Sequence, residues 1–396
     1  MAFHCIRIPQ IVLPSESVDM QSWAVIACDQ HTSDVNYWIE LEKFIGNKPS
    51  TLRLTLPEIY LQKESEQQIA EIQKTMREYK AAGIFHKLEQ GMILVERKTN
   101  LSPMRRGIVL SIDLESYSFE KKSSAAVRAT EATIVERIPP RIKIRDGAIY
   151  EFPHIMLLYN DPTKVVLSPI LNKDLPVLYD FDLNMNGGHV CGKWIGNDES
   201  VLTRFESLVQ DGLLFMVGDG NHSLATAKSL WDNIKISLSD SERENHPARF
   251  ALCEAVNLYD DGINFEAIHR IVKNVNAERF VKGMNDFGNT PSRMYKNGIS
   301  YPFFVADSVP EAVAGVDAYI QNYIESHGGS VDYIHGETDL RNMTAEDKNC
   351  VGICLPKMDK SELFKCVKEY GSLPRKTFSM GESEEKRYYI EGKEIL

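Results

Sequence analysis

One short stretch of the chain combines an acid, a base and two glycines in a pattern that can do chemistry. A carboxylate such as Asp219 can bind a metal ion or take up a proton, and the imidazole of His222 can move a proton near neutral pH. Gly218 and Gly220 flank the acid, and because glycine adopts positive φ without steric cost they predict a tight turn. These residue types suit a turn that places an acid and a base beside a ligand.

The residues on both sides of this turn predict a strand before it and a helix after it. Leu213 to Val217 form a continuous apolar run, which is typical of a short strand buried on both faces. Leu224 and Ala227 begin a helical apolar pattern, with Asn221 or Ser223 expected as the N-cap. A helix N-terminus presents free N–H groups and a positive dipole end, so it can bind an anion such as phosphate. A plain glycine turn with a capping Asn is the alternative, and turn chemistry alone weighs the two about evenly.

Two further segments carry residues suited to a polar site. Asp29 follows the short apolar strand predicted over residues 23–27, and α/β folds bind ligands beyond the carboxyl ends of strands. Arg128 and Glu131 follow a small, polar and basic stretch over residues 121–125, and this pairing suits phosphate and metal binding. On the residues alone, Asp29 could equally cap a loop, and a solvated salt bridge is the favoured interpretation of Arg128 and Glu131.

The stretch Gly218 to Ala227 resembles the Asp-Gly-His-His-Arg element of a prokaryotic family catalogued as a domain of unknown function, DUF ten-fifteen. Three other stretches match the same family and extend the resemblance over nearly the whole chain: Arg128 to Thr133, Asp260 to Gly262 with His269 and Arg270, and Leu373 to Phe378. The resemblance favours functional roles for Asp29, Arg128 and Glu131 over a capping role and a solvated salt bridge.

The Asp-Gly-x-His element is also similar to the nucleotide-binding motif of the ParB/sulfiredoxin-like proteins, which include CTP-binding partition proteins, sulfiredoxins and a free-serine kinase. That motif commonly has an Arg where this chain has Ser223, and a hydroxyl is a weaker phosphate partner than a bidentate guanidinium. Arg270 is the candidate to replace this clamp in the family setting. The resemblance implies a bound nucleotide (ATP, ADP or CTP) together with Mg²⁺.

Composition limits the classes of function that the chain can have. The net charge of -11 argues against sequence-independent nucleic-acid binding, which needs a basic surface. No apolar run approaches the roughly 20 residues that span a bilayer, and the first residues lack the apolar segment of a signal peptide. Seven scattered cysteines are typical of reduced thiols. We therefore expect a cytoplasmic protein that does not enter a membrane.

The order of the predicted elements favours an α+β (mixed α/β) fold with mixed sheets. A main body over residues 1–275 would hold the ParB/sulfiredoxin-like element, and residues 276–396 would form a C-terminal α+β lobe. Apolar runs over residues 92–97, 107–114, 155–159 and 250–258 predict strands, and Asn186-Gly187 predicts a hairpin.

Phosphoryl transfer is the chemistry that these parts fit best. The chain has no Walker loop, complete Gly-x-Gly-x-x-Gly fingerprint, Gly-x-Ser-x-Gly elbow or His-Glu-x-x-His helix. Phosphoryl transfer needs backbone donors and a cation for phosphate, a carboxylate for Mg²⁺ and a base. The catalytic candidates are Asp219, His222, Asp29 and Glu131, with Asp219 also the metal ligand; the phosphate-binding candidates are Gly218, Gly220, Asn221, Ser223, Arg128 and Arg270.

The favoured prediction is a nucleotide-dependent phosphotransferase that acts on a small hydroxyl metabolite, by resemblance to the serine-kinase branch. A non-enzymatic nucleotide-binding conformational switch and a metal-assisted phosphohydrolase are the alternatives. The acidic net charge weighs against a DNA-bound switch. The expected partners are a nucleotide and a small-molecule substrate, and the sequence leaves open whether the chain forms a homo-oligomer.

Overall fold

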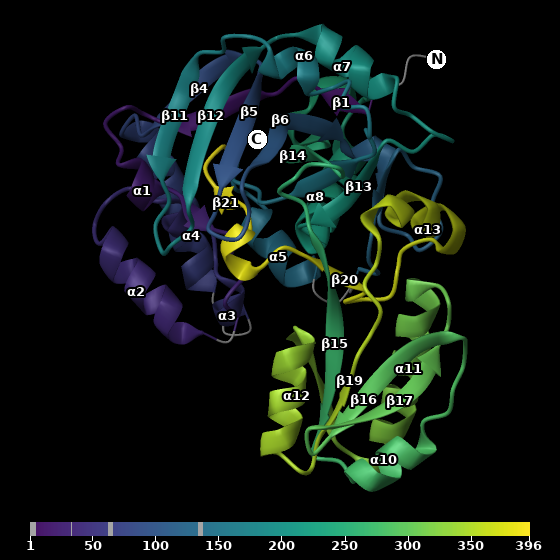
Figure 1. The fold of residues 1–396 in the computed structure, drawn as a ribbon. Coiled ribbons are helices and arrows are strands. Elements are labelled where there is room, and N and C mark those ends of the chain that lie inside the picture. The colour runs from purple at the N-terminus through teal and green to yellow at the C-terminus, as the bar shows by residue number, and fades with distance from the viewer. Residues whose placement is uncertain (1–4, 33, 62–65, 134–137) are drawn as a thin grey trace. The chain divides into compact units, whose positions relative to one another are not determined.

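The computed structural model describes residues 5–32, 34–61, 66–133 and 138–396, which form two compact units (Figure 1). The first unit contains Met1–Ile263 and Glu382–Leu396, and the second contains Asn264–Gly381. This division differs from the expected one at residue 275, because the strand that follows Asn264 pairs within the second unit and the C-terminal segment pairs within the first.

A ten-stranded mixed sheet forms the centre of the first unit. Its strands follow the order β11-β12-β5-β6-β14-β10-β13-β8-β7, with β1 on β6. The β10–β14, β13–β8 and β7–β8 pairs are parallel, and the other pairs of this sheet are antiparallel. The strand bounds are β1 (Ile6–Arg7), β5 (Met92–Lys98), β6 (Arg105–Asp113), β7 (Tyr117–Ser118), β8 (Val127–Ala129), β10 (Met156–Tyr159), β11 (Val177–Asp182), β12 (His189–Gly196), β13 (Phe215–Asp219) and β14 (Phe250–Asn257). The predicted mixed α+β class is confirmed.

Both faces of this sheet are buried, which explains the continuous apolar runs of its strands. Met92 and Leu94 of β5 belong to one apolar core, whereas Ile93 and Val95 belong to the other, because successive side chains of a strand point to opposite faces. The first core contains side chains from α6 (Ser168–Leu171), α7 (Glu199–Glu206) and α8 (Asn221–Ile234). The second contains side chains from α1 (Met20–Trp23), α2 (Val35–Ile45) and α4 (Glu66–Ala81).

The predicted hairpin at Asn186-Gly187 is confirmed, since β11 and β12 pair antiparallel on either side of it. Met185 and Asn186 both adopt positive φ, at 49° and 62°, which is the backbone that a tight hairpin turn requires. Three two-stranded pairings complete the first unit: β2 (Gln10–Pro14) with β4 (Phe85–Gln90), β3 (Val25–Ile26) with β21 (Tyr388–Tyr389), and β9 (Tyr150–Glu151) with β22 (Lys393–Glu394). Its other helices are α3 (Glu58–Leu61), α5 (Ile138–Arg145) and α9 (Asp240–Asn245).

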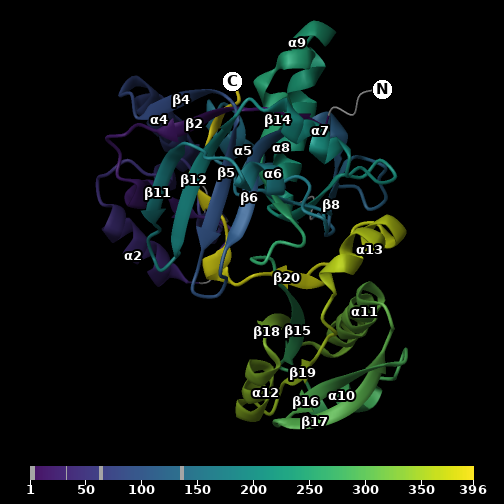
Figure 2. The same cartoon turned by 45° about the horizontal axis from the view of Figure 1, so that its top comes forward.

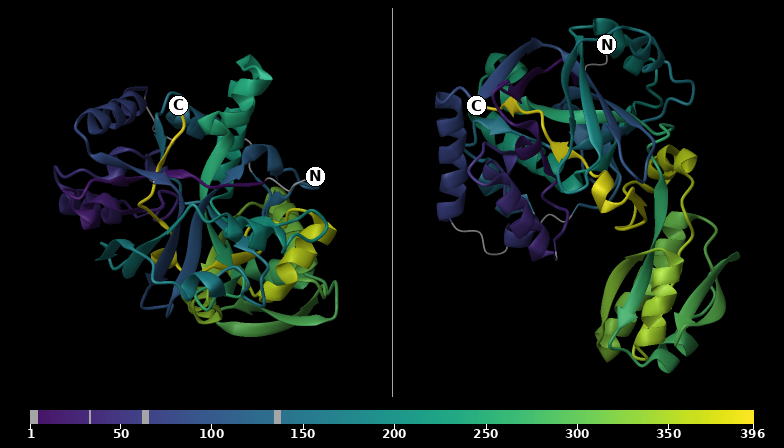
Figure 3. Two further views of the ribbon diagram at one scale, coloured as in Figure 1. Left: turned by 90° about the horizontal axis from the view of Figure 1, so that it is seen from above. Right: turned by 60° about the vertical axis from the view of Figure 1, so that its left-hand side comes forward.

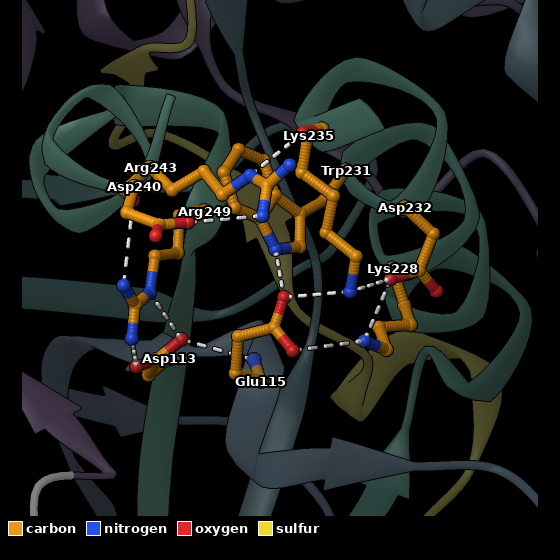
Figure 4. Close-up of polar contacts among 9 residues, drawn as sticks. All are labelled: Asp113, Glu115, Lys228, Trp231, Asp232, Lys235, Asp240, Arg243 and Arg249. Atoms are coloured by element: carbon orange, nitrogen blue, oxygen red, sulfur yellow. Dashed lines mark hydrogen bonds and ion pairs between the residues drawn. The ribbon is translucent and has the colours of Figure 1, made fainter. Parts of the chain in front are cut away.

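A polar network fixes α8 to the end of β6 (Figure 4). Glu115, just beyond β6, accepts hydrogen bonds from Trp231 Nε1 at 2.6 Å and from Lys235 Nζ at 2.8 Å. Asp113 accepts two hydrogen bonds from Arg249, from Nε at 2.9 Å and from a terminal nitrogen at 2.6 Å. The contacts of Glu115 hold the C-terminal end of α8, and the bidentate Asp113–Arg249 pair fixes the segment just before β14 to β6. Helix α9 follows α8 in the chain (Figure 2).

The second unit is a smaller α+β body. Its sheet has the order β17-β16-β19-β15-β18, with β20 also on β15. Helices α10 and α11 share one apolar core with Val272, and α12 covers Ile271 on the opposite face. The element bounds are β15 (Phe265–Lys273), α10 (Ala277–Gly283), β16 (Thr290–Lys296), β17 (Ile299–Val305), α11 (Val309–His327), β18 (Ser330–His335), α12 (Glu337–Glu346), β19 (Val351–Ile353), α13 (Leu363–Tyr370) and β20 (Phe378–Met380).

Two expectations from composition can be compared with the structure. All seven cysteines lie in the described ranges, and all are free and buried. Within those same ranges, no helix combines the length and the apolar character that crossing a bilayer requires.

Candidate functional site

The predicted strand, glycine turn and helix are present at the centre of the first unit. Strand β13 ends at Asp219 and α8 begins at Asn221, with Gly220 between them as the N-cap at φ 77° and ψ 27°. The expectation that Asn221 or Ser223 caps the helix was wrong, because the left-handed backbone of Gly220 already turns the chain into the helix. Gly220 has no side chain to cap α8, and a helix N-terminus presents N–H groups and a dipole end that can bind anions.

The position of Gly220 is set by a close approach to the segment before β10. A Cβ at residue 220 would lie 3.0 Å from the Cα of Ile155 and 3.4 Å from Nε2 of His154. Strands β10 and β13 are antiparallel, with Met156 opposite Asp219, so the residues just before β10 meet the residues just after β13. The pairing therefore places the imidazole of His154 against the glycine turn.

Two acid–base pairs lie around the turn. Asp219 Oδ2 is 3.2 Å from Nζ of Lys386, and its Oδ1 accepts a hydrogen bond from the backbone N–H of Gly220 at 2.9 Å. Asp29 Oδ2 is 3.3 Å from Nε2 of His154. This is an ion-pair distance without hydrogen-bond alignment, and the buried Nε2 has no hydrogen-bond partner within the part of the chain that the structure describes.

Tyr389 links the Asp29–His154 pair to the segment after β3. Its hydroxyl accepts a hydrogen bond from the backbone N–H of Cys28 at 2.9 Å and lies 3.1 Å from Nδ1 of His154. Strand β21, which contains Tyr389, pairs with β3, and Asp29 follows β3 by three residues. The C-terminal segment and the segment after β3 therefore position Asp29 and His154 together.

Mutual attraction sets the protonation states of these groups. Burial alone would raise the pKa of Asp29, but the positive charges of His154 and Lys386 outweigh it and hold this pKa well below its usual range. Burial would lower the pKa of His154, but Asp29 and Asp219 outweigh it and raise that pKa. Burial would likewise lower the pKa of Lys386, but Asp219 and Asp29 raise it. Asp29 is therefore a carboxylate, and Lys386 an ammonium, at neutral pH.

The residues after β8 reach the same edge of the sheet as the helix N-terminus. The hydroxyl of Thr130 donates to the carbonyl of Val217 at 2.6 Å, and Nδ2 of Asn221 lies 3.5 Å from Thr130 Oγ1. Glu131 is the next residue after Thr130. Arg128 lies on β8 opposite Met216, and its Nε donates to the carbonyl of Ala125 at 2.8 Å.

The remaining predicted residues fall into two groups. Gly218 is the penultimate residue of β13, and His222 and Ser223 are the second and third residues of α8. Arg270 lies on β15 in the second unit, with its side chain fully buried. Its guanidinium donates to both oxygens of Asp317 at 2.8 and 2.9 Å, and it also donates to three backbone carbonyls, those of Ile268, Lys376 and Arg375. All five N–H donors of the guanidinium therefore have an acceptor, and a phosphate would have to displace one of these.

Sequence reasoning missed His154, Lys386 and Tyr389. His154 directly precedes the predicted strand over residues 155–159, which is the available signal for a residue at a sheet edge. Lys386 stands in a run rich in Glu and Ser, a composition that is typical of solvated charges. No local pattern distinguishes it from a surface lysine.

The donor set fits a magnesium ion held jointly with a phosphate better than a closed metal cage. Among the described residues, no group of three or more His, Cys, Asp or Glu side chains is arranged to hold a metal ion. Mg²⁺ is usually bound through one or two carboxylates together with substrate phosphates, so Asp219 beside an anion site is compatible with it.

The family of the chain follows from comparison of its sequence with known families. This chain belongs to the family described as "Protein of unknown function (DUF1015)". The family model matches residues 11–390, which confirms the predicted membership. The further similarity of the Asp-Gly-x-His element to ParB/sulfiredoxin-like proteins stays a prediction. None of the curated proteins matches the chain.

Several solved structures show a low similarity to this chain. A variant of a free serine kinase in complex with AMP has a TM-score of 0.42 and 11% identity, covering 71% of this chain and 91% of its own. A conserved hypothetical protein from Pyrococcus furiosus has a TM-score of 0.38 and 11% identity, covering 71% and 94%. SbnI with a C-terminal truncation, from Staphylococcus aureus, has a TM-score of 0.38 and 10% identity, covering 69% and 82%.

Proposed function

We propose that this protein is a nucleotide-dependent phosphotransferase that acts on a small hydroxyl metabolite, with ATP, ADP or CTP as the donor. One observation carries the proposal. The helix N-terminus of α8, whose N-cap Gly220 has no side chain, lies beside the Asp219–Lys386 and Asp29–His154 pairs. These are the parts that phosphoryl transfer requires: an anion site, a carboxylate beside it, a cation and a base.

The first turn of α8 would hold the terminal phosphate of the nucleotide. Backbone N–H groups and the helix dipole favour a negative charge at this end. Gly220 lets the backbone come close to a ligand, because it has no side chain over the turn. Asp219 is the residue that would hold Mg²⁺, and the ion, when bound, would neutralise the charge on the phosphate oxygens.

Asp29 would act as the base. Its carboxylate is ionised at neutral pH, and the Asp29 side chain is 32% exposed, so an acceptor hydroxyl can reach it. The hydroxyl would give its proton to Asp29 as its oxygen bonds to the terminal phosphorus. The bond from that phosphorus to the bridging oxygen would break, and the shortened nucleotide would leave with the bonding electrons. The products would be a phosphorylated metabolite and a nucleotide with one phosphate fewer.

The test is to incubate the protein with Mg²⁺, isotope-labelled ATP, ADP or CTP and a pool of cell metabolites, and to search for newly phosphorylated species by mass spectrometry. We expect one labelled metabolite whose yield matches the shortened nucleotide. Asp29→Asn should reduce its formation by about a hundredfold or more, as loss of a positioned base does. Asp240→Asn is the matched control, because the Asp240 side chain is 98% exposed and lies outside the site.

Other outcomes of this experiment would indicate a different function for the site. Nucleotide binding that changes the oligomeric state, with no phosphorylated metabolite, would contradict the kinase proposal in favour of a conformational switch. Release of phosphate to water without an acceptor would favour a phosphohydrolase. If no nucleotide binds at any attainable concentration, all three functions are overturned.

A further inference from the structure

The C-terminal segment of the chain crosses the first unit and ends within it, as the yellow trace in the right-hand view of Figure 3 shows. Several contacts fix it beside the glycine turn. Tyr388 and Tyr389 pair with β3, and the backbone N–H of Ala27 donates to the carbonyl of Arg387 at 2.9 Å. Arg97, from the large sheet, donates to the carbonyl of Lys386 at 3.1 Å. The backbone of Lys386 is therefore held in a defined place before any ligand arrives.

The side chain of Lys386 extends from this fixed backbone to the N-terminal end of α8. Its Nζ lies 3.2 Å from Asp219 Oδ2, and Asp219 directly precedes the helix N-cap. The side chain is only 15% exposed, so most of it is removed from water. A partly desolvated cation at a helix N-terminus strengthens the attraction of that end for an anion.

A second, independent observation also points to a ligand at this place. His154 is 8% exposed, and its Nε2 makes no aligned hydrogen bond with the residues that the structure describes, although Asp29 Oδ2 lies 3.3 Å away. That nitrogen lies 3.4 Å from where a Cβ on Gly220 would be, so it faces the same turn. A buried ring nitrogen that is paired only by charge still lacks a hydrogen bond, which a ligand can supply.

We propose that Lys386 is the cation that binds the terminal phosphate in this site. It would take the place of the guanidinium that is absent at Ser223, since the donors of Arg270 are engaged within the second unit. Lysine suits this task as a compact charge with three rotatable donors. Nζ would turn from the carboxylate of Asp219 to a phosphate oxygen, and that carboxylate would become available to a cation. The inference rests on the proposed function and adds to it the residue that recognises phosphate.

The test is isothermal titration of the full chain with ATP, ADP, CTP and pyrophosphate in the presence of Mg²⁺. We expect Lys386→Met to weaken binding by about tenfold or more, as loss of a charge-assisted hydrogen bond does. Lys386→Arg should retain most of the affinity, because it keeps the charge and the donors.

Lys228→Met is the matched control for lost charge. Its side chain is also 15% exposed and pairs with Asp232 on α8, away from the turn. We expect its affinity for the same probes to stay within about twofold of the parent, since it loses an equal charge without losing a phosphate contact.

Each result decides the proposal. Binding by Lys386→Met at parental affinity would overturn the role of Lys386 and leave the proposed function standing. Equal losses in Lys386→Met and Lys228→Met would overturn it too, because net charge alone would then explain both. If Lys386→Met does not fold, Lys386→Arg decides the proposal. A folded Lys386→Arg that loses affinity by about tenfold or more would overturn the role of the positive charge. A parent chain that binds none of the probes would overturn both proposals.

Discussion

Arg387 donates from Nε to Oε2 of Glu254 at 2.7 Å, and this pair joins the C-terminal segment to β14. The two side chains are 4% and 1% exposed. One terminal nitrogen of the guanidinium donates to Glu391 at 2.7 Å, and the other donates to the carbonyl of Pro153, the residue before His154. Arg387 therefore fixes the backbone next to Lys386 and the segment that contains His154.

We predict that Arg387→Met destabilises the protein by about 3–5 kcal/mol, because it removes the cation of buried Glu391 and leaves Glu254 with Arg105 at 3.7 Å. Chemical denaturation measures this loss. Lys48→Met is the control, since Lys48 and Asp19 form an exposed pair whose side chains are 56% and 41% exposed. Its loss should be below about 1 kcal/mol. Similar losses in the two variants would show that the buried pair contributes no more than a surface pair.

Gly220→Ala should reduce both stability and anion binding. The residue has φ 77°, and an added Cβ would lie 3.0 Å from the Cα of Ile155, a backbone atom that cannot rotate away. The left-handed backbone costs an alanine about 1–2 kcal/mol, and the contact adds to that cost. Gly83→Ala is the control, because Gly83 has φ 68° and the described structure places nothing within 4 Å of its Cβ position. Thermal unfolding and pyrophosphate titration of both variants measure the difference, and equal melting temperatures would contradict the crowding argument.

Asp29→Asn should lower the pKa of His154. Burial lowers this pKa, and the charge of Asp29 is the first of the effects that raise it, so its removal leaves burial less opposed. NMR titration of the histidine ring protons follows the midpoint directly. Asp180→Asn supplies the comparison: Asp180 lies 2.6 Å from His189 Nε2, so that variant should shift His189 and leave His154 unchanged. An unchanged His154 midpoint in Asp29→Asn would mean that the two side chains do not interact in solution.

Lys393→Met should change how stability depends on pH. Burial lowers the pKa of Lys393 from 10.5 to about 8, against the attraction of Glu151. The folded state thus binds this proton less tightly than the unfolded chain. The destabilisation is fully present below pH 8 and disappears as the pH rises from 8 to 10.5.

Denaturation of the parent and of Lys393→Met at about pH 7 and about pH 10 isolates this effect, since other groups titrate in both chains. Relative to the variant, the parent should gain on the order of 3 kcal/mol between the two pH values. A difference that stays constant with pH would mean that Lys393 titrates as it does in the unfolded chain.

The sequence by itself determined the features that depend on neighbours along the chain. The apolar run over residues 213–217, the two glycines and the helical spacing from Leu224 specify a strand, a turn and a helix, and the structure has all three. Asn186-Gly187 predicts a hairpin, and β11 and β12 meet there, although positive φ falls on Met185 and Asn186 rather than on Gly187. In each case the decisive interactions act within a few residues, so a local pattern is sufficient.

Only the tertiary structure decided which side chains share the site and what caps α8. The close approach of Ile155 to the turn fixed Gly220 as the N-cap, and no residue near Gly220 in sequence announces that contact. The hydroxyl of Tyr389 meets His154 across 235 positions of chain, and Lys386 meets Asp219 because β21 pairs with β3. Strand pairing between distant segments depends on the packing of the whole unit. A run of charged residues has the same sequence pattern whether it lies in solvent or in a buried site, so only that packing distinguishes the two.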